Sequence, residues 1–389
     1  MRKALGLVIP ILALAAAPAR AGEPPALPAA AQVSADRAQL SKAATDGVRL
    51  VKNMWWNSRA GWYDERLNGS GSHPLASIWS TVHLFNALNA VAAADHTRFH
   101  VRMLENFANR ADQLYWNPVA GHVPHTRRHV GGYSPYPNWR GPKVHTYYDD
   151  NGWLGLAFFN AWQNSGKKRY LKAAERAFAF TAVTGWAKQL GGGVWWDTRH
   201  TSRSSEGIAS NALLAALLYR ETHRAGYLRW ARVYIAWANG HIWDPKAQLY
   251  IRDPHSAILM AYVQSPFMAA QQVLCEATGD QSRCAAAQAL AEASVRHFPA
   301  AVSHGPQYDS MYLQWMLFQY QQDHDPRWYA LAYYNAKRAL SNSGDGTGLF
   351  VRDWDGDALP NGDTLQAETS TLSLFAWVAA APPPQAPSP

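Results

Sequence analysis

Several features are missing from this sequence, and each absence excludes a class of protein. After the apolar run from Leu5 to Ala17, no stretch approaches the roughly 20 apolar residues that a membrane-spanning helix needs. Lys and Arg residues are scattered, without the concentrated basic stripe of a nucleic-acid-binding protein. The sequence has no Gly-x-Ser-x-Gly elbow and no phosphate loop ending in Gly-Lys-Ser/Thr. We therefore expect no stable membrane insertion, no nucleic acid partner and no nucleotide site.

Cysteine is scarce, with only two residues in the chain. Cys275 and Cys284 lie nine positions apart, and no histidine-rich neighbour completes a metal-ligand set around them. In an oxidising compartment this spacing predicts a disulfide that joins the end of one helix to the start of the next.

The two ends of the chain differ from the rest. Residues 1–21 have the form of a secretory signal, with two basic residues before the apolar run and small residues at its end. Residues 22–33 are a Pro/Ala-rich leader, and residues 381–389 are a Pro-rich tail, so neither is expected to build a core. The sequence thus predicts an exported protein, secreted or periplasmic, with one domain over residues 34–380.

Helical segments of two kinds alternate along that domain. Residues 153–162 are apolar nearly all round, as in a fully buried helix, whereas residues 167–183 have one apolar and one charged face. Buried-type segments begin near residues 75, 150, 208, 257, 308 and 365, and amphipathic ones near 34, 96, 167, 225, 281 and 326. Six inner and six outer helices predict an all-α fold, an (α/α)6 barrel. An open superhelix of helical hairpins is the competing architecture.

Two adjacent carboxylates, Asp149 and Asp150, stand at the start of the second buried-type helix. One aspartate is explained as a helix cap, but two among aromatic residues are costly to bury without a function. Like charges held close push their pKa values apart, so that one carboxyl stays protonated while the other ionises. Retaining glycoside hydrolysis needs such a pair, a nucleophile and an acid/base about 5–5.5 Å apart.

Three motifs resemble glycoside hydrolase family 76, the α-1,6-mannanases. The segment Tyr147–Trp153 is similar to the family's catalytic Asp-Asp-Asn motif, Gly191–Trp196 to its Gly-Gly-Gly-Ile-Trp-Trp element, and Ser210–Asn211 to the element that follows. The resemblance implies an (α/α)6 barrel that needs no cofactor or metal. It also implies that Asp149 is the nucleophile and Asp150 the general acid/base, acting on mannan.

The sequence departs from the family's pattern at two places. Ser205–Gly207 stand where the family often has a basic or amide pair, and Tyr262–Pro266 keep only the Tyr and Gln of the related segment. These departures bear on the substrate and the cleavage pattern more than on the type of reaction.

Further substrate contacts are expected near the starts of the buried-type helices. Three glycines precede a Trp pair, of which one indole can face a sugar while the other packs inward. Asp309 is also a candidate acid for an inverting scheme. The predicted substrate-binding residues are Tyr148, Asn151, Trp195, Trp196, Tyr262, Gln264, Tyr308 and Asp309.

Residues 117–146 form an insertion rich in Gly, Pro, Tyr and His. Its three histidines, His122, His125 and His129, are expected on a surface loop rather than in a zinc site. Other side chains of the insertion are candidates to wall distant sugar subsites, namely Arg127, Arg128, Tyr133, Tyr136 and Trp139.

The sequence as a whole predicts a monomeric, exported, endo-acting retaining glycosidase that cleaves α-1,6-mannosidic linkages in a mannan-like polysaccharide. Three alternatives remain open: a transglycosylase, another toroid enzyme such as an uronyl hydrolase or sugar epimerase, and a non-catalytic glycan-binding protein. The 18 Trp and 18 Tyr residues do not separate these, because such rings fill helical cores as well as stack on sugars.

Overall fold

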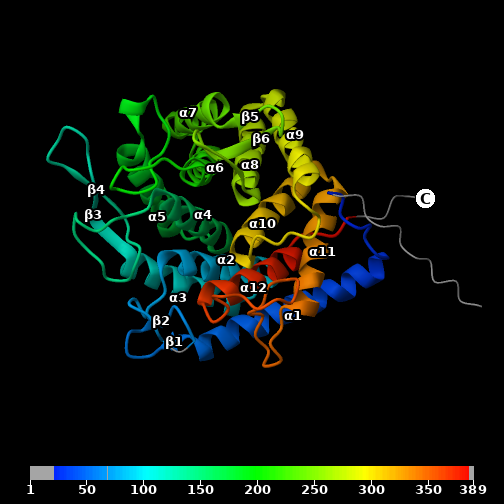
Figure 1. The fold of residues 1–389 in the computed structure, drawn as a ribbon. Helices are drawn as coiled ribbons and strands as arrows, with labels where there is room; N and C mark the ends of the chain where they lie inside the picture. Colours follow the sequence, from blue (N-terminus) through cyan, green and yellow to red (C-terminus); the bar gives the residue numbers. More distant parts are fainter. Residues whose placement is uncertain (1–21, 68, 385–389) are drawn as a thin grey trace, which may run out of the picture.

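The computed structural model describes residues 22–67 and 69–384, and these contain twelve α-helices in two concentric rings (Figure 1). The inner ring consists of α2 (Ile78–Asp95), α4 (Tyr148–Ser165), α6 (Ser205–Thr222), α8 (Ala261–Thr278), α10 (Pro306–Asp323) and α12 (Leu365–Ala380). The outer ring consists of α1 (Ala30–Met54), α3 (Arg98–Tyr115), α5 (Lys168–Phe180), α7 (Ala225–His241), α9 (Gln281–His297) and α11 (Pro326–Asn342).

The ring of inner helices is closed. Each inner helix packs against the next, and α12 returns to pack against both α2 and α1. In Figure 1 the C-terminal helix α12, in red, accordingly lies beside the N-terminal helix α1, in blue. The fold is therefore the predicted (α/α)6 barrel rather than an open superhelix.

Inner helices end abruptly, and this explains the short connections to the outer ring. Five of the six inner helices are followed by a residue in the left-handed conformation, which stops the helix and turns the chain. These residues are His96, Gly166, His223, Gly279 and His324. The outer helix then begins within two or three residues, so this end of the barrel carries only short loops.

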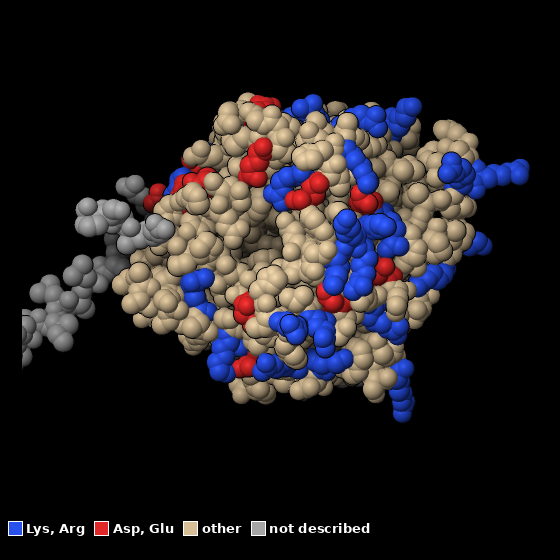
Figure 2. Space-filling view, turned by 180° about the vertical axis from the view of Figure 1, so that it is seen from behind, with Lys and Arg blue, Asp and Glu red and all other residues tan. Residues whose placement is uncertain are grey.

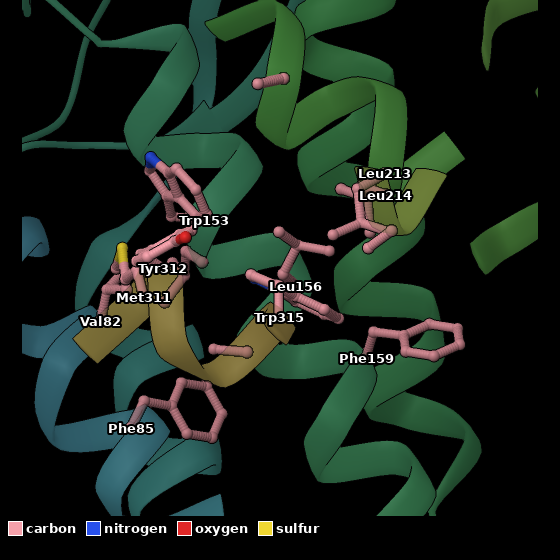
Figure 3. Packing of buried hydrophobic residues seen from close by; sticks show 14 of the residues in the cluster. Val82, Phe85, Trp153, Leu156, Phe159, Leu213, Leu214, Met311, Tyr312 and Trp315 are labelled. Carbon is pink, nitrogen blue, oxygen red and sulfur yellow. The ribbon is translucent and has the colours of Figure 1, made fainter. Parts of the chain in front are cut away.

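Apolar side chains from facing inner helices fill the barrel. Figure 3 shows buried side chains of several inner helices packed together, among them Phe85 of α2, Leu156 of α4 and Met311 of α10. Close approach of α4 to α6 depends on Gly152, since a Cβ atom there would lie 2.2 Å from the Ser210 hydroxyl oxygen. The uniformly apolar segments of the sequence thus became helices that are buried on every side.

The opposite end, where inner helices begin, carries longer connections with short antiparallel strands. They form three small sheets: β1 (Trp56–Asn57) with β2 (Trp62–Tyr63), β3 (Trp116–His122) with β4 (His129–Tyr133), and β5 (Trp243–Asp244) with β6 (Leu249–Asp253) and β7 (Ser256–Leu259). The β3–β4 hairpin belongs to the predicted insertion and projects from the side of the molecule in Figure 1.

The structure also bears on the ends of the chain and the cysteines. Helix α1 begins at Ala30, so the last residues of the expected leader are helical. The expected signal, residues 1–21, and the tail beyond residue 384 lie outside the described residues. The predicted disulfide is present, joining Cys275 in α8 to Cys284 in α9.

Among the described residues, no helix is both long and apolar enough to cross a membrane. On the face shown in Figure 2, Lys and Arg side chains are mixed with Asp and Glu around a central hollow. That face has no unbroken basic surface of the kind that binds nucleic acid.

Candidate active site

A cavity of about 650 Å³ opens where the inner helices begin, and we call it the front cavity. Its volume lies within the range of about 300–1,000 Å³ that is usual for ligand sites. Inner helices α2, α4, α6, α8 and α10 and the loops before them supply its walls. The lining residues are Trp79, Tyr147, Asp149, Asp150, Trp153, Trp196, Ser202, Arg203, Ser204, Glu206, Arg252, Asp253, Met260, Ala261, Tyr262, His304, Tyr308 and Asp309.

Asp149 and Asp150 lie in the first turn of α4 and reach this cavity from the barrel rim. The chain is extended at Tyr147 and becomes helical at Tyr148, and hydrogen bonds from the Asp149 and Asp150 backbone in this first turn favour the charged form of Asp149. Asn151 fixes this helix start because its side chain accepts from the Tyr133 N–H (2.7 Å) and donates to the Tyr133 carbonyl (3.0 Å). Strand β4 thus positions the aspartate pair.

Gln264 fixes the start of α8 in the same way, by bonding to the backbone of a strand. Its side chain accepts from the N–H of Tyr250 in β6 and donates to the carbonyl of the same residue, both at 2.8 Å. Like Asn151, it is the fourth residue of its helix and is fully buried. Both side chains therefore clamp a strand to a helix start and do not line the front cavity.

Tyr148 and Trp195, also expected to touch substrate, lie behind the cavity wall. The Tyr148 hydroxyl donates to the Thr184 carbonyl (2.9 Å), and the ring stacks on Phe180. The Trp195 ring stacks on His200 with centroids 5.3 Å apart. Neither residue lines the front cavity, so both support the site from within the protein.

Trp196 and two tyrosines do line the cavity. The Trp196 side chain is 40% exposed, and its ring meets that of Tyr147 edge to face. Across the site the Tyr262 and Tyr308 rings lie 4.8 Å apart. Accessible aromatic faces beside carboxylates suit a sugar, whose C–H faces pack on rings while its hydroxyls take hydrogen bonds.

The glycine run before the Trp pair makes a tight turn. Gly192 and Gly193 have φ values of 110° and 90°, a region that only glycine adopts without strain. A Cβ atom at either position would also come within 2.8 Å of a tryptophan ring. Beyond the turn the chain is extended and pairs at Trp195, so successive side chains point inward and outward.

The electrostatics separate the two aspartates. Burial, then the nearby Glu206 charge, raises the pKa of Asp149 to about 7. Burial and the adjacent Asp149 charge raise the pKa of Asp150 well above its ordinary value. Because each charge disfavours the other, the pair loses its first proton more readily than its second, so one carboxyl can be ionised while the other stays protonated.

Asp309 supplies a third carboxyl to the cavity, and its side chain is buried. One of its oxygens, Oδ2, accepts from the N–H groups of His304 (2.9 Å) and Gly305 (3.2 Å) at the start of α10. Its other oxygen, Oδ1, is buried without a hydrogen-bond partner in the described structure and lies 3.8 Å from Nδ1 of His304. Burial raises the pKa of Asp309 to about 7.

Glu206 also lies inside the site, although its sequence context predicts no role for it. The Glu206 carboxyl lies 3.4 Å from the Tyr262 hydroxyl and 3.8 Å from the Arg252 guanidinium, and burial raises its pKa. The sequence nevertheless contains a signal for Glu206, because this residue lies in the first turn of an inner helix just as Asp150 does. Trp79, Trp153 and Arg252 were missed as well.

The insertion, residues 117–146, does not line the front cavity, although part of it lies beside the cavity. The Tyr136 ring packs on His73 (4.1 Å) and near Trp139 (4.9 Å). Burial raises the pKa of Tyr136, and the nearby charge of Asp150 is among the charges that raise it further, so Tyr136 lies close to the aspartate pair. Tyr133 is instead fully buried, and its hydroxyl donates to Asp112 (2.7 Å).

The three histidines of the insertion lie on the exposed β3–β4 hairpin. His122 and His129 are cross-strand partners, and His125 sits at the turn with a φ of 60°. Across the described residues, no group of three or more His, Cys, Asp or Glu side chains is arranged to hold a metal ion.

Comparison with known proteins places this site in a family. The sequence model of Glycosyl hydrolase family 76 matches residues 51–376. No curated protein sequence matches the chain.

Solved structures share the fold at low identity. A GH76 α-mannanase from Bacteroides thetaiotaomicron superposes with a TM-score of 0.77 at 18% identity, covering 90% of this chain and 98% of its own. The GH76A α-1,6-mannanase from Salegentibacter gives 0.69 at 17% identity, covering 87% and 99%. Dfg5 from Chaetomium thermophilum, solved with glucosamine, gives 0.68 at 15% identity, covering 92% and 93%. With the family match over most of its length, the chain belongs to glycoside hydrolase family 76.

Proposed function

We propose that this glycoside hydrolase cleaves α-1,6-mannosidic linkages within a mannan-type polysaccharide, with retention of anomeric configuration, after export from the cell as a monomer. The observation that carries the proposal is the pair of adjacent carboxyls, Asp149 and Asp150, at the wall of an aromatic-lined cavity, where burial and neighbouring charges raise both pKa values. An inactive variant of the Salegentibacter enzyme, changed at two adjacent aspartates, was solved with α-1,6-mannotetrose, which supports the same linkage here.

In the first step the ionised Asp149 attacks the anomeric carbon of the bound mannose unit. Asp150 donates its proton to the glycosidic oxygen, so the leaving chain departs as a neutral alcohol. Asp149 suits the nucleophile because hydrogen bonds from the Asp149 and Asp150 backbone favour its charged form, and its Oδ1 has no hydrogen-bond partner in the described structure. The product of this step is a glycosyl ester on Asp149.

In the second step Asp150, now ionised, takes a proton from a water molecule as the water attacks the anomeric carbon. The ester bond to Asp149 breaks, and mannose leaves with its original configuration after two inversions. Asp149 and Asp150 thereby return to their starting protonation states.

Endo action is supported by what surrounds the cavity. The insertion lies to one side and contributes no residue to the lining, so it does not close the cavity. Tyr136 and Trp139 of the insertion pack with His73, Tyr136 lies near enough to Asp150 to sense its charge, and Trp139 is 39% exposed, so these rings are candidates to bind sugar units beyond the cavity. A polysaccharide can then occupy sites on both sides of the cleaved bond.

Product analysis tests the proposal. Wild-type protein should release short manno-oligosaccharides from linear α-1,6-mannan, seen by chromatography, whereas Asp149→Asn and Asp150→Asn release essentially none. Asp280→Asn is the matched control, since it makes the same change at the start of the outer helix α9, outside the front cavity. Undiminished release from both variants of the pair would refute the two-aspartate mechanism.

Transglycosylation is the second candidate, because it shares the first step and differs only in the acceptor. Incubation with mannotriose at high concentration separates the two: hydrolysis gives only shorter products, and transfer gives longer ones.

A further inference from the structure

A second cavity, of about 270 Å³, lies at the other end of the barrel, and we call it the rear cavity. It is built from the last turns of α4, α6, α10 and α12, the end opposite the aspartate pair. Along α4 its first lining residue, Asn160, is ten residues beyond Asp150, or about 15 Å at 1.5 Å per residue. Between the cavities lie core side chains such as Leu156 and Tyr312, shown in Figure 3.

Two amide side chains of largely buried residues open onto the rear cavity. Asn160 is 8% exposed and Gln314 is 7% exposed, and neither is among the buried polar side chains of the described residues that lack a partner. Their amide atoms are therefore accessible from the cavity, where a ligand or water can form hydrogen bonds with them. Gln163, Gln321 and Gln322 add further amides to the same lining.

Aromatic rings complete the lining. Trp315 and Phe318 meet edge to face with centroids 5.7 Å apart. Trp377 lies on the same cavity, and its indole N–H is buried without a partner in the described structure. Rings and amides together match a ligand with C–H faces and many hydroxyl groups.

The charge of the lining favours a neutral ligand. Arg220 is the single charged residue of the lining, and two carboxylates face it, Glu221 at 3.3 Å and Glu276 at 3.7 Å. Its charge is therefore already compensated, and an anion would gain little there. The volume is slightly below the usual range of about 300–1,000 Å³, which limits the ligand to one small ring.

We propose that the rear cavity is a second saccharide site, which binds one neutral sugar unit through the amides of Asn160 and Gln314 and the ring of Trp315. This site takes no part in the proposed cleavage, because the barrel core separates it from Asp149. The proposal stands whether or not the front cavity hydrolyses mannan.

Calorimetric titration with methyl α-mannopyranoside tests the proposal, with methyl α-glucopyranoside, methyl α-galactopyranoside and myo-inositol as further neutral probes. The double variant Asn160→Leu/Gln314→Leu keeps side-chain volume but removes the amides, and we expect at least tenfold weaker binding. Gln281→Ala is the matched control, because this glutamine is exposed on α9 and lines neither cavity.

A second double variant keeps the proposal testable if Asn160→Leu/Gln314→Leu does not fold. Gln163→Ala/Gln322→Ala removes two amides nearer the surface, and we expect severalfold weaker binding with an unchanged melting temperature. The Trp196→Ala variant of the front cavity should retain the rear binding event. The proposal is overturned if no neutral probe binds saturably, or if both rear double variants bind as many probe molecules per chain as wild type. It is also overturned if the event removed by the rear double variants is already lost in Trp196→Ala, or if inorganic phosphate competes with the probe for that event.

Discussion

The two ends of the barrel are built from the same six inner helices, yet they differ in length of loop and in charge. At the front end, where these helices begin, carboxyls with raised pKa values lie in the first turns of α4, α6, α10 and α12. At the rear end, left-handed residues close the helices within short connections, and the lining of the cavity is mostly uncharged.

This difference shows at which end the fold tolerates buried carboxylates. Helix starts supply free N–H groups that partly compensate a buried carboxylate, whereas helix ends would repel it. Asp149 at the start of α4 illustrates the rule: hydrogen bonds from the Asp149 and Asp150 backbone in the same turn favour its charged form, although burial raises its pKa to about 7. Burial of these carboxyls at the front end therefore lowers the stability of the fold but supplies acids that can react.

The largest expected effect is on catalysis at the front end. Asp149→Asn should lower kcat by at least about 10³-fold because it removes the nucleophile, and Asp150→Asn by about 10²–10⁴-fold because it removes the proton donor. Steady-state kinetics on α-1,6-mannan measure this, with thermal melting to show that the variants fold. Near-wild-type kcat in either variant would place the chemistry elsewhere.

The next effect concerns packing between α4 and α6. Gly152→Ala would place a methyl group 2.2 Å from the Ser210 hydroxyl oxygen, so the helices must separate, at a cost of about 1–3 kcal/mol. Denaturant unfolding measures the loss. Gly226→Ala on the outer helix α7 is the control, since no atom lies within 4 Å of the added group. Equal stabilities for the two variants would contradict this packing.

Asp309 gives a pH-dependent effect on stability. Its pKa is raised to about 7 in the folded state from an ordinary 3.8, so between these values the folded state holds the proton more tightly. The contribution of the Asp309 carboxyl to the free energy of unfolding is therefore fully present below about pH 4 and falls as the pH rises toward 7. Asp309→Asn should therefore be more stable than wild type at pH 8, by about 1–3 kcal/mol, with little difference at pH 4. Denaturant unfolding at the two pH values measures this, and a greater gain at pH 4 would reverse the sign and reject the account.

The smallest effect is a shift of the pH profile. The Glu206 charge contributes to raising the pKa of Asp149, so Glu206→Gln should lower that pKa and move the acidic limb of kcat/KM to lower pH. The shift is expected to be under about one pH unit, because burial is the larger cause. Gln281→Ala, on the surface of α9, is the control, and its profile should match wild type. An acidic limb that stays in place in Glu206→Gln shows that Glu206 does not act on Asp149.

The fold could be predicted because the burial of a helix determines how apolar residues are spaced along its sequence. All six uniformly apolar segments became inner helices, and all six amphipathic ones became outer helices. The aspartate pair was also found from sequence, since two adjacent carboxyls in an otherwise apolar helix are costly unless they serve a function.

The walls of the site were less predictable, because neighbouring residues on a helix start point in different directions. Of the eight residues expected to bind substrate, Trp196, Tyr262, Tyr308 and Asp309 line the front cavity, while Tyr148, Asn151, Trp195 and Gln264 do not. Asn151 and Gln264 turn inward to clamp strands that are distant in sequence, a pairing that periodicity does not encode. Glu206 escaped notice because its partners come from two other segments, α8 and β6.

The central claim is that Asp149 and Asp150 divide the roles of nucleophile and acid/base in retaining hydrolysis. Proton NMR of the first products from α-1,6-manno-oligosaccharides tests it most directly, when recorded before the anomers equilibrate. The account predicts that the α-anomer appears first and the β-anomer only later by mutarotation. A β-anomer formed first would mean inversion, which would contradict the ester on Asp149 and point to a water activated from another carboxylate.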